Sequence, residues 1–465
     1  MTRNVVLICL DSVRKDYFDR YAKRLASAAD VFFEQCRAAS SWSVPSHASM
    51  LTGTLPHQHG VHTHNLDFST ISTEETFLDL LTDYKTLGVS ANGFASSDFG
   101  FDKHLDEFVD INPTNRFPEG IDIHQLNTSS KERLIHDFIR KVLEHDYPLK
   151  SVTNALLAQV NSTARDLPIK QPSDTGAKTV SEKAEALVAT ADSPFFLFMN
   201  YMDAHGPMYP IRQYDDEIYS APRSWKSDVI NTWDLNESDG LDGYETDVKT
   251  YRELYGASIE YLDRVVSSLV NRIDEISPGQ TTYIVTSDHG ENLGFEDDGY
   301  LFSHVSSLSE GLLHVPLLVI NPPDGYSPQQ SELVSHADLG DLVVGIAQGE
   351  HSDISSDRIA AERIGIGSMN PDVSDKEFWN RLLRCAYRDS EKYIWDSRGN
   401  GRQEQIGTDI ERRDVIESVP DWALELFERC ATKYKSEVTD QANQAEIDEG
   451  ARERLNNLGY LNSIE

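Results

Sequence analysis

Short apolar runs, separated by longer polar and helical stretches, set the pattern of this chain. Each run is almost continuously apolar, which is typical of strands buried on both faces of a parallel sheet. Strand-like runs alternate with helical stretches along most of the chain, which predicts an α/β fold with a doubly wound, mostly parallel sheet flanked by helices. The runs lie at residues 4–10, 86–90, 195–199, 282–286 and 315–320.

Apolar residues at helical spacing predict the helices that cover this sheet. We expect one helix over residues 16–36 and another that ends near Gly279. In the second helix the apolar residues recur at steps of four and three, the spacing of a helix face that packs on a sheet. Its apolar positions are Tyr255, Ile259, Leu262, Val266, Leu269 and Ile273.

The length of 465 residues exceeds one typical core and predicts a large domain with a smaller appendage. We assign residues 1–330 to the large α/β domain, with insertions at about 111–190 and 211–246. Residues 331–465 are expected to form a small α+β subdomain, with a strand at residues 392–395.

Charge and composition narrow the classes of protein to which the chain can belong. The 77 acidic and 42 basic residues give a net charge of −35, which disfavours nucleic acid and anionic membranes as partners. Acidic residues spread along the chain are typical of a halophilic protein from a high-salt cytoplasm. The sequence has no window of about eighteen apolar residues, so no membrane span is predicted. With no signal-peptide pattern and four widely spaced cysteines, the chain is expected to be cytoplasmic and free of disulfides.

Ser43 lies in the segment 41–53, at the predicted start of a short helix. Pro45 suits the first helical turn and Gly53 suits the C-terminal stop, so Ser43 is expected at or near the N-cap. Free backbone N–H groups there favour a phosphate or sulfate, and they favour the alkoxide form of a serine nucleophile. An ordinary N-cap serine has the same local sequence, so the rest of the chain has to decide between a cap and a nucleophile.

Carboxylate and imidazole side chains follow or precede several predicted strands. In a parallel sheet these strand ends meet at one edge, where open α/β folds bind their ligands. Oxygen and nitrogen donors gathered there suit a divalent metal, such as Ca, Mg, Mn or Zn. A metal beside Ser43 would hold its hydroxyl as an alkoxide and polarise an ester oxygen. The candidate residues are Asp11, Asp203, His205, Asp288, His289 and His304.

Motifs in a fixed order point to a family. Residues 4–11 read NVVLICLD and residues 286–291 read TSDHGE, and further matching segments lie at 51–61, 255–263, 304–317 and 454–461. In this order and over nearly the whole chain, the sequence resembles the sulfatase family of the alkaline phosphatase superfamily. The resemblance implies one metal held by Asp11, Asp288 and His289, with Ser43 completing its coordination. It also implies a second metal, as in the phosphodiesterase relatives, on Asp203, His205 and His304.

The nucleophile motif departs from that of the formylglycine sulfatases. Their motif is Cys or Ser followed by x-Pro-x-Arg, whereas this chain has Ser43-Val44-Pro45-Ser46-His47. The histidine resembles the Thr-x-Pro-x-His motif of nucleotide pyrophosphatases and phosphodiesterases, which attack with the hydroxyl itself. We therefore include His47 among the catalytic residues and expect an unmodified Ser43. If only one metal binds, His205 can act as the general acid that protonates the leaving oxygen.

These features predict a metal-dependent hydrolase of sulfate or phosphate esters that acts through a covalent intermediate on Ser43. A small-molecule or glycan ester is the expected substrate. One alternative is a transferase that passes a phospho or sulfo group to a sugar or lipid hydroxyl. A second alternative is a non-catalytic binding protein, which the presence of Asp11, Ser43, Asp288 and His289 disfavours.

Overall fold

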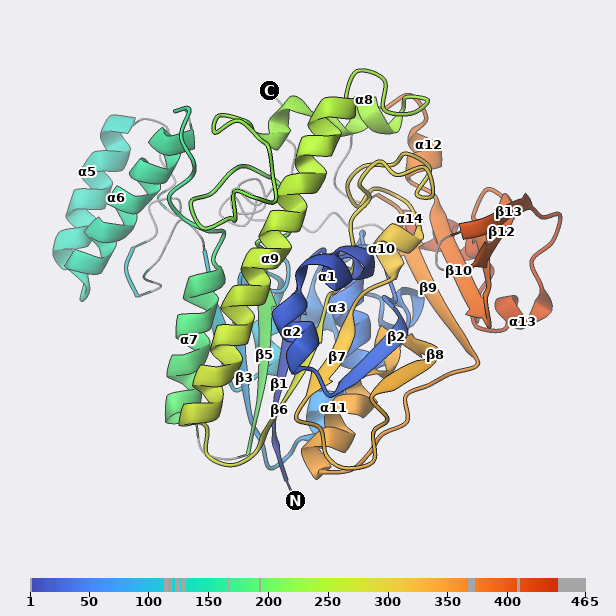
Figure 1. Ribbon diagram of the computed structural model, residues 1–465, viewed down its shortest axis with the longest axis horizontal. Helices are drawn as coiled ribbons and strands as arrows, with labels where there is room; N and C mark the ends of the chain where they lie inside the picture. The colour runs from blue at the N-terminus through green and yellow to red at the C-terminus, as the bar shows by residue number, and fades with distance from the viewer. Residues whose placement is uncertain are drawn as a thin grey trace.

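The structure is a computed structural model of the chain (Figure 1). It describes residues 2–112, 117, 119–121, 126, 131–165, 167–191, 194–366, 373–407 and 410–441. The predicted motif at residues 454–461 lies outside these ranges.

An eight-stranded sheet with the order β4-β3-β5-β1-β6-β7-β2-β8 forms the centre of the molecule. All neighbouring strands run parallel except that β7 is antiparallel to both β6 and β2. The predicted mostly parallel sheet is therefore confirmed. The strands are β1 (Asn4–Leu10), β2 (Val31–Arg37), β3 (Lys85–Ser90), β4 (Glu107–Asp110), β5 (Phe195–Tyr201), β6 (Thr281–Thr286), β7 (Leu317–Ile320) and β8 (Gln329–Ser335).

Central strands β1, β5 and β6 are buried at every position, as their continuous apolar sequences predict. In register, Leu10 of β1 pairs with Tyr201 of β5, and Cys9 pairs with Thr286 of β6. The residues that follow these three strands consequently emerge side by side at one edge of the sheet.

Helices cover both faces of this sheet (Figure 1). On one face α9 (Glu245–Ile276) packs against α7 (Ala177–Thr190), α1 (Lys15–Tyr21) and α2 (Lys23–Ala28). All six apolar residues predicted for the face of α9 are buried, which confirms the periodicity. The opposite face carries α3 (Ser43–Thr52) and α11 (Leu339–Gln348), which contact each other, and α11 also contacts β1.

The prediction of one helix over residues 16–36 is wrong. The first part forms α1 and α2, which are interrupted at Ala22, and Val31–Arg37 is strand β2. Phe32, Phe33 and Cys36 belong to a segment rich in β-branched and aromatic residues, which suits a strand. Pairing with β8 on one side and β7 on the other fixes it as a strand.

A second, five-stranded antiparallel sheet with the order β13-β12-β11-β10-β9 forms the C-terminal part. The predicted strand at residues 392–395 is confirmed as part of β11. The predicted domain boundary at residue 330 falls inside β8, and that strand joins the main sheet. The strands are β9 (Arg358–Ile364), β10 (Leu382–Arg388), β11 (Glu391–Asp396), β12 (Gly401–Ile406) and β13 (Ile410–Val415).

Smaller helices complete the described chain. The helices α5 (Lys131–Glu144) and α6 (Pro148–Arg165) pack on each other and project from the body (Figure 1). Among the described helices, none combines the length and the apolar character that crossing a membrane requires. The remaining α-helices are α4 (Pro56–His59), α8 (Thr232–Asn236), α10 (Glu310–Leu313), α12 (Lys376–Trp379), α13 (Asp421–Leu424) and α14 (Ala431–Gln441). Short 3-10 turns lie at Phe68–Thr70, Thr73–Glu75, Phe77–Leu80, Ser97–Phe99, Phe101–His104, Ser227–Val229 and His336–Asp338.

Candidate active site

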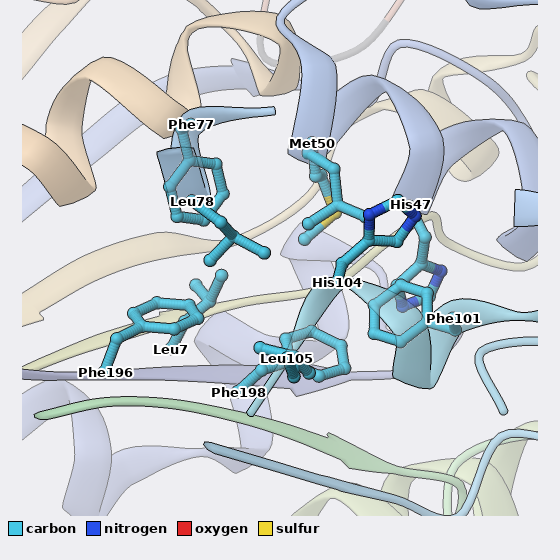
Figure 2. Close-up of a pocket in the computed structure, with 11 residues that line it drawn as sticks. Leu7, His47, Met50, Phe77, Leu78, Phe101, His104, Leu105, Phe196 and Phe198 are labelled. Carbon is cyan, nitrogen blue, oxygen red and sulfur yellow. The ribbon is translucent and has the colours of Figure 1, made fainter. Parts of the chain in front are cut away.

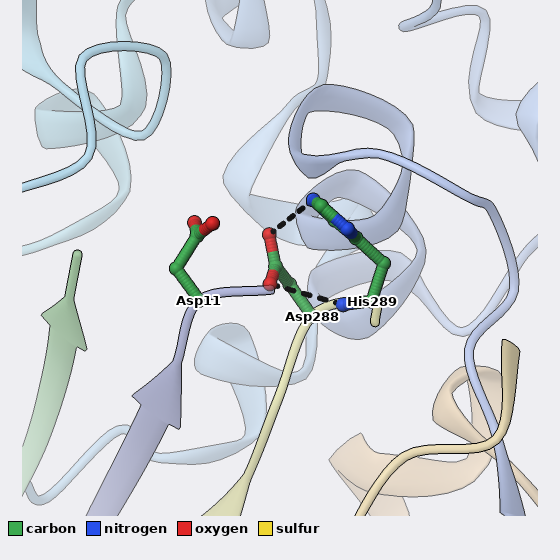
Figure 3. Close-up of side chains that lie close together, drawn as sticks. All are labelled: Asp11, Asp288 and His289. Carbon is green, nitrogen blue, oxygen red and sulfur yellow. Dashed lines mark hydrogen bonds and ion pairs between the residues drawn. The ribbon is translucent and has the colours of Figure 1, made fainter. Parts of the chain in front are cut away.

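Asp11, Asp288 and His289 form a fully buried group at the carboxyl edge of the main sheet. Asp11 follows β1, and the other two follow β6 (Figure 3). One potential ligand atom from each lies within 4.8 Å of the others. The backbone brings them together as the sequence predicts, because β1 and β6 are adjacent parallel strands.

The hydrogen bonds of His289 fix which ring nitrogen can bind a metal. Its Nδ1 lies 2.7 Å from the carbonyl oxygen of Gly290, and a carbonyl only accepts, so Nδ1 carries the proton. The lone pair is therefore on Nε2, which lies 3.4 Å from Asp288 Oδ2. Burial, together with a smaller effect of the nearby His304, lowers the pKa of His289 to about 3. A neutral imidazole held by a carbonyl is the usual form of a metal-ligating histidine.

The two aspartates also have the properties of ligands. Asp288 Oδ1 accepts hydrogen bonds from the backbone N–H groups of Ser12, at 3.2 Å, and His289, at 3.0 Å. The other oxygen, Oδ2, is buried and has no hydrogen-bond donor among the described residues. Burial raises the pKa of Asp11, and the neighbouring Asp288 raises it further. Two buried carboxylates so close together repel each other, and a divalent cation between them would relieve that repulsion. The donor set therefore fits a metal.

Ser43 is the first residue of α3, and Trp42 occupies the N-cap position. Gly53 ends the helix in the left-handed conformation with φ 71°, as the sequence predicts for the C-terminal stop. Ser43 Oγ lies 3.3 Å from Asp11 Oδ2 and 3.3 Å from His289 Nε2. The predicted nucleophile therefore touches two of the three candidate ligands at the positive end of a helix.

Asn92 was not predicted as a site residue. Its Nδ2 donates to Asp11 Oδ2 at 2.5 Å and to Ser43 Oγ at 3.0 Å, while its Oδ1 accepts from the N–H groups of Phe94 and Ala95. Asn92 comes two residues after β3. The rule that identified the aspartates at strand ends, applied to amides, would have identified it.

His47 lies one turn after Ser43 and supports the helix. Its Nδ1 donates to the Ser43 carbonyl at 2.8 Å, and its Nε2 accepts from Asn200 Nδ2 at 2.9 Å. Both ring nitrogens thus have a neutral hydrogen-bond partner, and Nδ1 also lies 3.7 Å from Asp288 Oδ2. Asn200, on β5, was also not predicted, and its sequence position inside a buried strand gives no sign of this contact.

Two histidines, His205 and His304, lie beside the group formed by Asp11, Asp288 and His289. The rings of His205 and His304 are 5.1 Å apart, and those of His304 and His289 are 5.1 Å apart. His304 Nδ1 lies 3.3 Å from Glu291 Oε2. Burial raises the pKa of Glu291 to about 7, against the opposing effect of the histidines. Glu291 is the last residue of the motif at residues 286–291, and no role was predicted for it from the sequence.

Asp203 comes two residues after β5 and is buried. Its Oδ1 accepts from the N–H of Thr175 at 3.0 Å. Burial raises its pKa well above the ordinary value, and the nearby Asp174 raises it further. Among the described residues, Asp203, His205 and His304 do not form a three-ligand group of the kind that Asp11 forms.

An apolar pocket lies between α3 and the main sheet, next to His47 (Figure 2). Apart from His47 and His104, its lining is entirely apolar, so it offers little to an anionic ester. The pocket is lined by Leu7, His47, Met50, Leu51, Phe77, Leu78, Phe101, His104, Leu105, Phe196 and Phe198.

The proteins similar to this chain include two curated sulfatases and a structurally characterised phosphonate monoester hydrolase. An uncharacterized sulfatase YidJ of Escherichia coli K12 is 26% identical over 53% of this chain and 54% of its own length. The human iduronate 2-sulfatase is 23% identical over 69% of this chain and 60% of its own length. The chain thus matches little more than half of each relative. A phosphonate monoester hydrolase of Agrobacterium radiobacter shares the fold, with a TM-score of 0.57, 16% identity, and coverage of 98% of this chain and 95% of that one.

The model of the Sulfatase family matches residues 3–349. This match includes the whole main sheet and every residue of the candidate active site. The chain therefore belongs to the sulfatase family.

Proposed function

We propose that this protein is a metal-dependent hydrolase of sulfate or phosphate esters, with Ser43 as the nucleophile. The observation that supports this most directly is the position of Ser43 Oγ, 3.3 Å from both Asp11 Oδ2 and His289 Nε2. A serine that only capped a helix would bond to the backbone of its own first turn. The names of the similar proteins, a sulfatase and a phosphonate monoester hydrolase, favour hydrolysis over group transfer.

The residues around Ser43 suggest how the hydroxyl is activated. Ser43 Oγ–H can donate to Asp11 Oδ2, and a divalent metal held by the same carboxylate would favour the alkoxide form of the hydroxyl. Asn92 Nδ2 donates to the same oxygen of Ser43 and orients its lone pairs. The oxygen attacks sulfur or phosphorus, the bond to the leaving oxygen breaks, and water later cleaves the ester formed on Ser43.

Asp11, Asp288 and His289 would hold a divalent metal, and its positive charge would stabilise the alkoxide and the transferred anionic group. Ca, Mg, Mn and Zn all remain candidates for this ion. A second ion on Asp203, His205 and His304 stays a prediction, as does proton donation by His205 to the leaving oxygen. His205 Nδ1 lies 2.5 Å from the Gly206 carbonyl, which leaves Nε2 as the nitrogen for that role.

The state of Ser43 separates a serine hydrolase from a formylglycine sulfatase. We infer an unmodified serine, because His47 replaces the arginine of the formylglycine motif and is bonded to the Ser43 carbonyl. A serine alkoxide should cleave phosphate esters at least as well as sulfate esters, since metal and helix N-terminus favour the more highly charged transition state.

The test combines mass spectrometry of the peptide that carries Ser43 with assays on nitrophenyl sulfate, phosphate and phosphonate esters. We expect an unmodified serine, hydrolysis that a chelator abolishes, and a loss of about 1,000-fold or more in kcat for Ser43→Ala. Ser43→Thr should keep measurable activity, and Ser72→Ala, at an exposed turn, serves as the control. An aldehyde at Ser43, or hydrolysis confined to sulfate esters, would show instead that the protein is a formylglycine sulfatase. No hydrolysis of any ester with metal supplied would contradict the proposal.

A further inference from the structure

Arg363 is a buried cation next to the segment that carries the nucleophile. It belongs to β9 of the C-terminal sheet, and only 1% of it is exposed. Its Nη1 donates to Ser41 Oγ at 3.1 Å and to the His304 carbonyl at 3.0 Å. The guanidinium carbon lies 5.9 Å from the centre of the Trp42 ring. A residue far away in sequence thus brings positive charge to both the start of α3 and the histidine pair.

The acceptors of Arg363 are all neutral, whereas Arg384 and Arg37, which are also buried, have carboxylate partners. Arg384 pairs with Glu362 at 2.7 Å, and Arg37 pairs with Glu310 at 2.9 Å. Arg363 has no carboxylate within ion-pair distance among the described residues. Burial and the nearby Arg381 together lower its pKa to about 9, so it stays charged near pH 7. A buried, charged group without a counter-ion is costly to maintain, in a protein whose net charge is −35.

Hydrogen-bond donors at the same place also lack partners. Nε of Arg363 donates to the Gly365 carbonyl at 3.3 Å, and Nη2 donates to no group in the described part of the chain. The indole N–H of Trp42 is buried and has no acceptor among the described residues either. Trp42 is the N-cap residue directly before Ser43. Unused donors on a cation and on its neighbour suit an oxyanion, which accepts several hydrogen bonds at once.

We propose that Arg363, together with Trp42, forms a subsite for a second anionic group of the substrate, next to the ester that Ser43 attacks. The substrate class is then an ester that also carries a carboxylate, a sulfate or a phosphate. This inference rests on the proposed function and narrows its substrate. The planar guanidinium can bind any of these groups through two parallel hydrogen bonds. Arg363 belongs to the C-terminal sheet and Trp42 precedes α3, so the C-terminal part would contribute to selecting the substrate that the main domain cleaves.

Two series of substrates test the subsite in the metal-loaded enzyme. One is a nitrophenyl ester without further charge, and the other is the same ester with a carboxylate on the ring. We expect the wild type to prefer the charged ester, and Arg363→Met to reduce kcat/KM for it by about tenfold or more, chiefly through KM. The uncharged ester should lose less than about threefold. Arg363→Lys should retain part of the preference, and Arg358→Met, which removes an exposed charge from the same strand, should retain all of it.

Losses that are equal for both esters would overturn the proposal, because Arg363 would then act only on Ser41 and the helix or on the reacting group. An unchanged preference would overturn it as well. Melting curves of the variants distinguish either result from unfolding, and Arg363→Lys provides a folded alternative if Arg363→Met is unstable. Calorimetry with benzenesulfonate and benzenedisulfonate measures the subsite without turnover. Tighter binding of the disulfonate that depends on Arg363 would support the subsite even if no ester were hydrolysed, whereas equal binding of the two would count against it.

Discussion

Asn92 Nδ2 lies 3.0 Å from Ser43 Oγ, although 49 positions separate the two residues in the chain. The same nitrogen donates to Asp11 Oδ2 at 2.5 Å, so one amide joins the nucleophile to a candidate metal ligand. Its oxygen is held by two backbone N–H groups, which fixes the orientation of the amide. Asn92 therefore holds Ser43 and Asp11 in a defined geometry before any ligand binds.

Replacing Asn92 should reduce kcat more than it raises KM. Asn92→Asp places a third carboxylate next to Asp11 and removes the donor to Ser43, so we expect a loss of about 100-fold in kcat. Asn92→Ala should lose about tenfold to 100-fold, because it removes the donor without adding charge. Steady-state kinetics with a nitrophenyl ester measures both. Activity of Asn92→Asp equal to that of the wild type would show that this amide does not orient the nucleophile.

Asp288→Asn should remove the metal and leave the fold intact. Asparagine Oδ1 can still accept from the N–H groups of Ser12 and His289, whereas the negative charge that binds a cation is gone. We expect metal affinity to fall by about tenfold or more and activity to fall with it. Elemental analysis after dialysis against Ca, Mg, Mn or Zn measures the metal. Asp353→Asn, on an exposed loop, is the control, and an unchanged metal content in Asp288→Asn would contradict the ligand assignment.

The stability of the protein should fall as the pH falls from about 6.5 to about 4. Burial, with a smaller effect of His64, lowers the pKa of His62 from 6.5 to about 4. Burial, with a smaller effect of Lys435, lowers the pKa of His64 to about 4. The unfolded chain takes up protons on these residues below pH 6.5, whereas the native state does not until about pH 4. The contribution of these histidines to the unfolding free energy is therefore fully present above pH 6.5, and it decreases as the pH falls below that value.

His62→Gln should flatten that dependence. His62 is 6% exposed, and each unit of pKa difference corresponds to about 1.4 kcal/mol of unfolding free energy. Between the two pH values, the unfolding free energy of the variant should therefore fall by roughly 1–3 kcal/mol less than that of the wild type. Urea unfolding at a series of pH values measures the difference. His136→Gln, on the exposed side of α5, provides the matched control. Parallel curves for the wild type and His62→Gln would contradict the assignment.

If the net charge of −35 is an adaptation to high salt, the stability of this protein should depend on ionic strength. Like charges spread over the surface repel one another, and salt screens them with a Debye length of about 10 Å at about 0.1 M and about 3 Å at about 1 M. The melting temperature should therefore rise steeply with KCl between about 0.1 and about 3 M. Calorimetry at a series of KCl concentrations measures the melting temperature. A melting temperature that does not depend on KCl would contradict an adaptation to high salt.

Much of the main domain could be predicted because its signals are local. The continuous apolar runs identified β1, β5 and β6, and the spacing of Tyr255 to Ile273 identified the buried face of α9. Local signals also gave the candidate site, because Asp11, Asp288 and His289 each follow a strand. The topology of a parallel sheet places such residues together without any knowledge of side-chain contacts.

Other features depended on pairing across the sheet or between domains. Val31–Arg37 was expected to be helical, and only its partners β7 and β8 show it to be a strand. The contact of Asn200 with His47, and that of Arg363 with Ser41, join segments more than 150 positions apart.

The sequence by itself therefore determined which strands form the core, where Ser43 begins a helix and which residues meet at the carboxyl edge. The tertiary structure decided the tautomer of His289, the partners of His47, and the contact of Arg363 with Ser41, two residues before the nucleophile. Apolar periodicity and strand ends are properties of neighbouring residues. A hydrogen bond or a missing counter-ion depends instead on which distant groups the fold brings within about 3 Å.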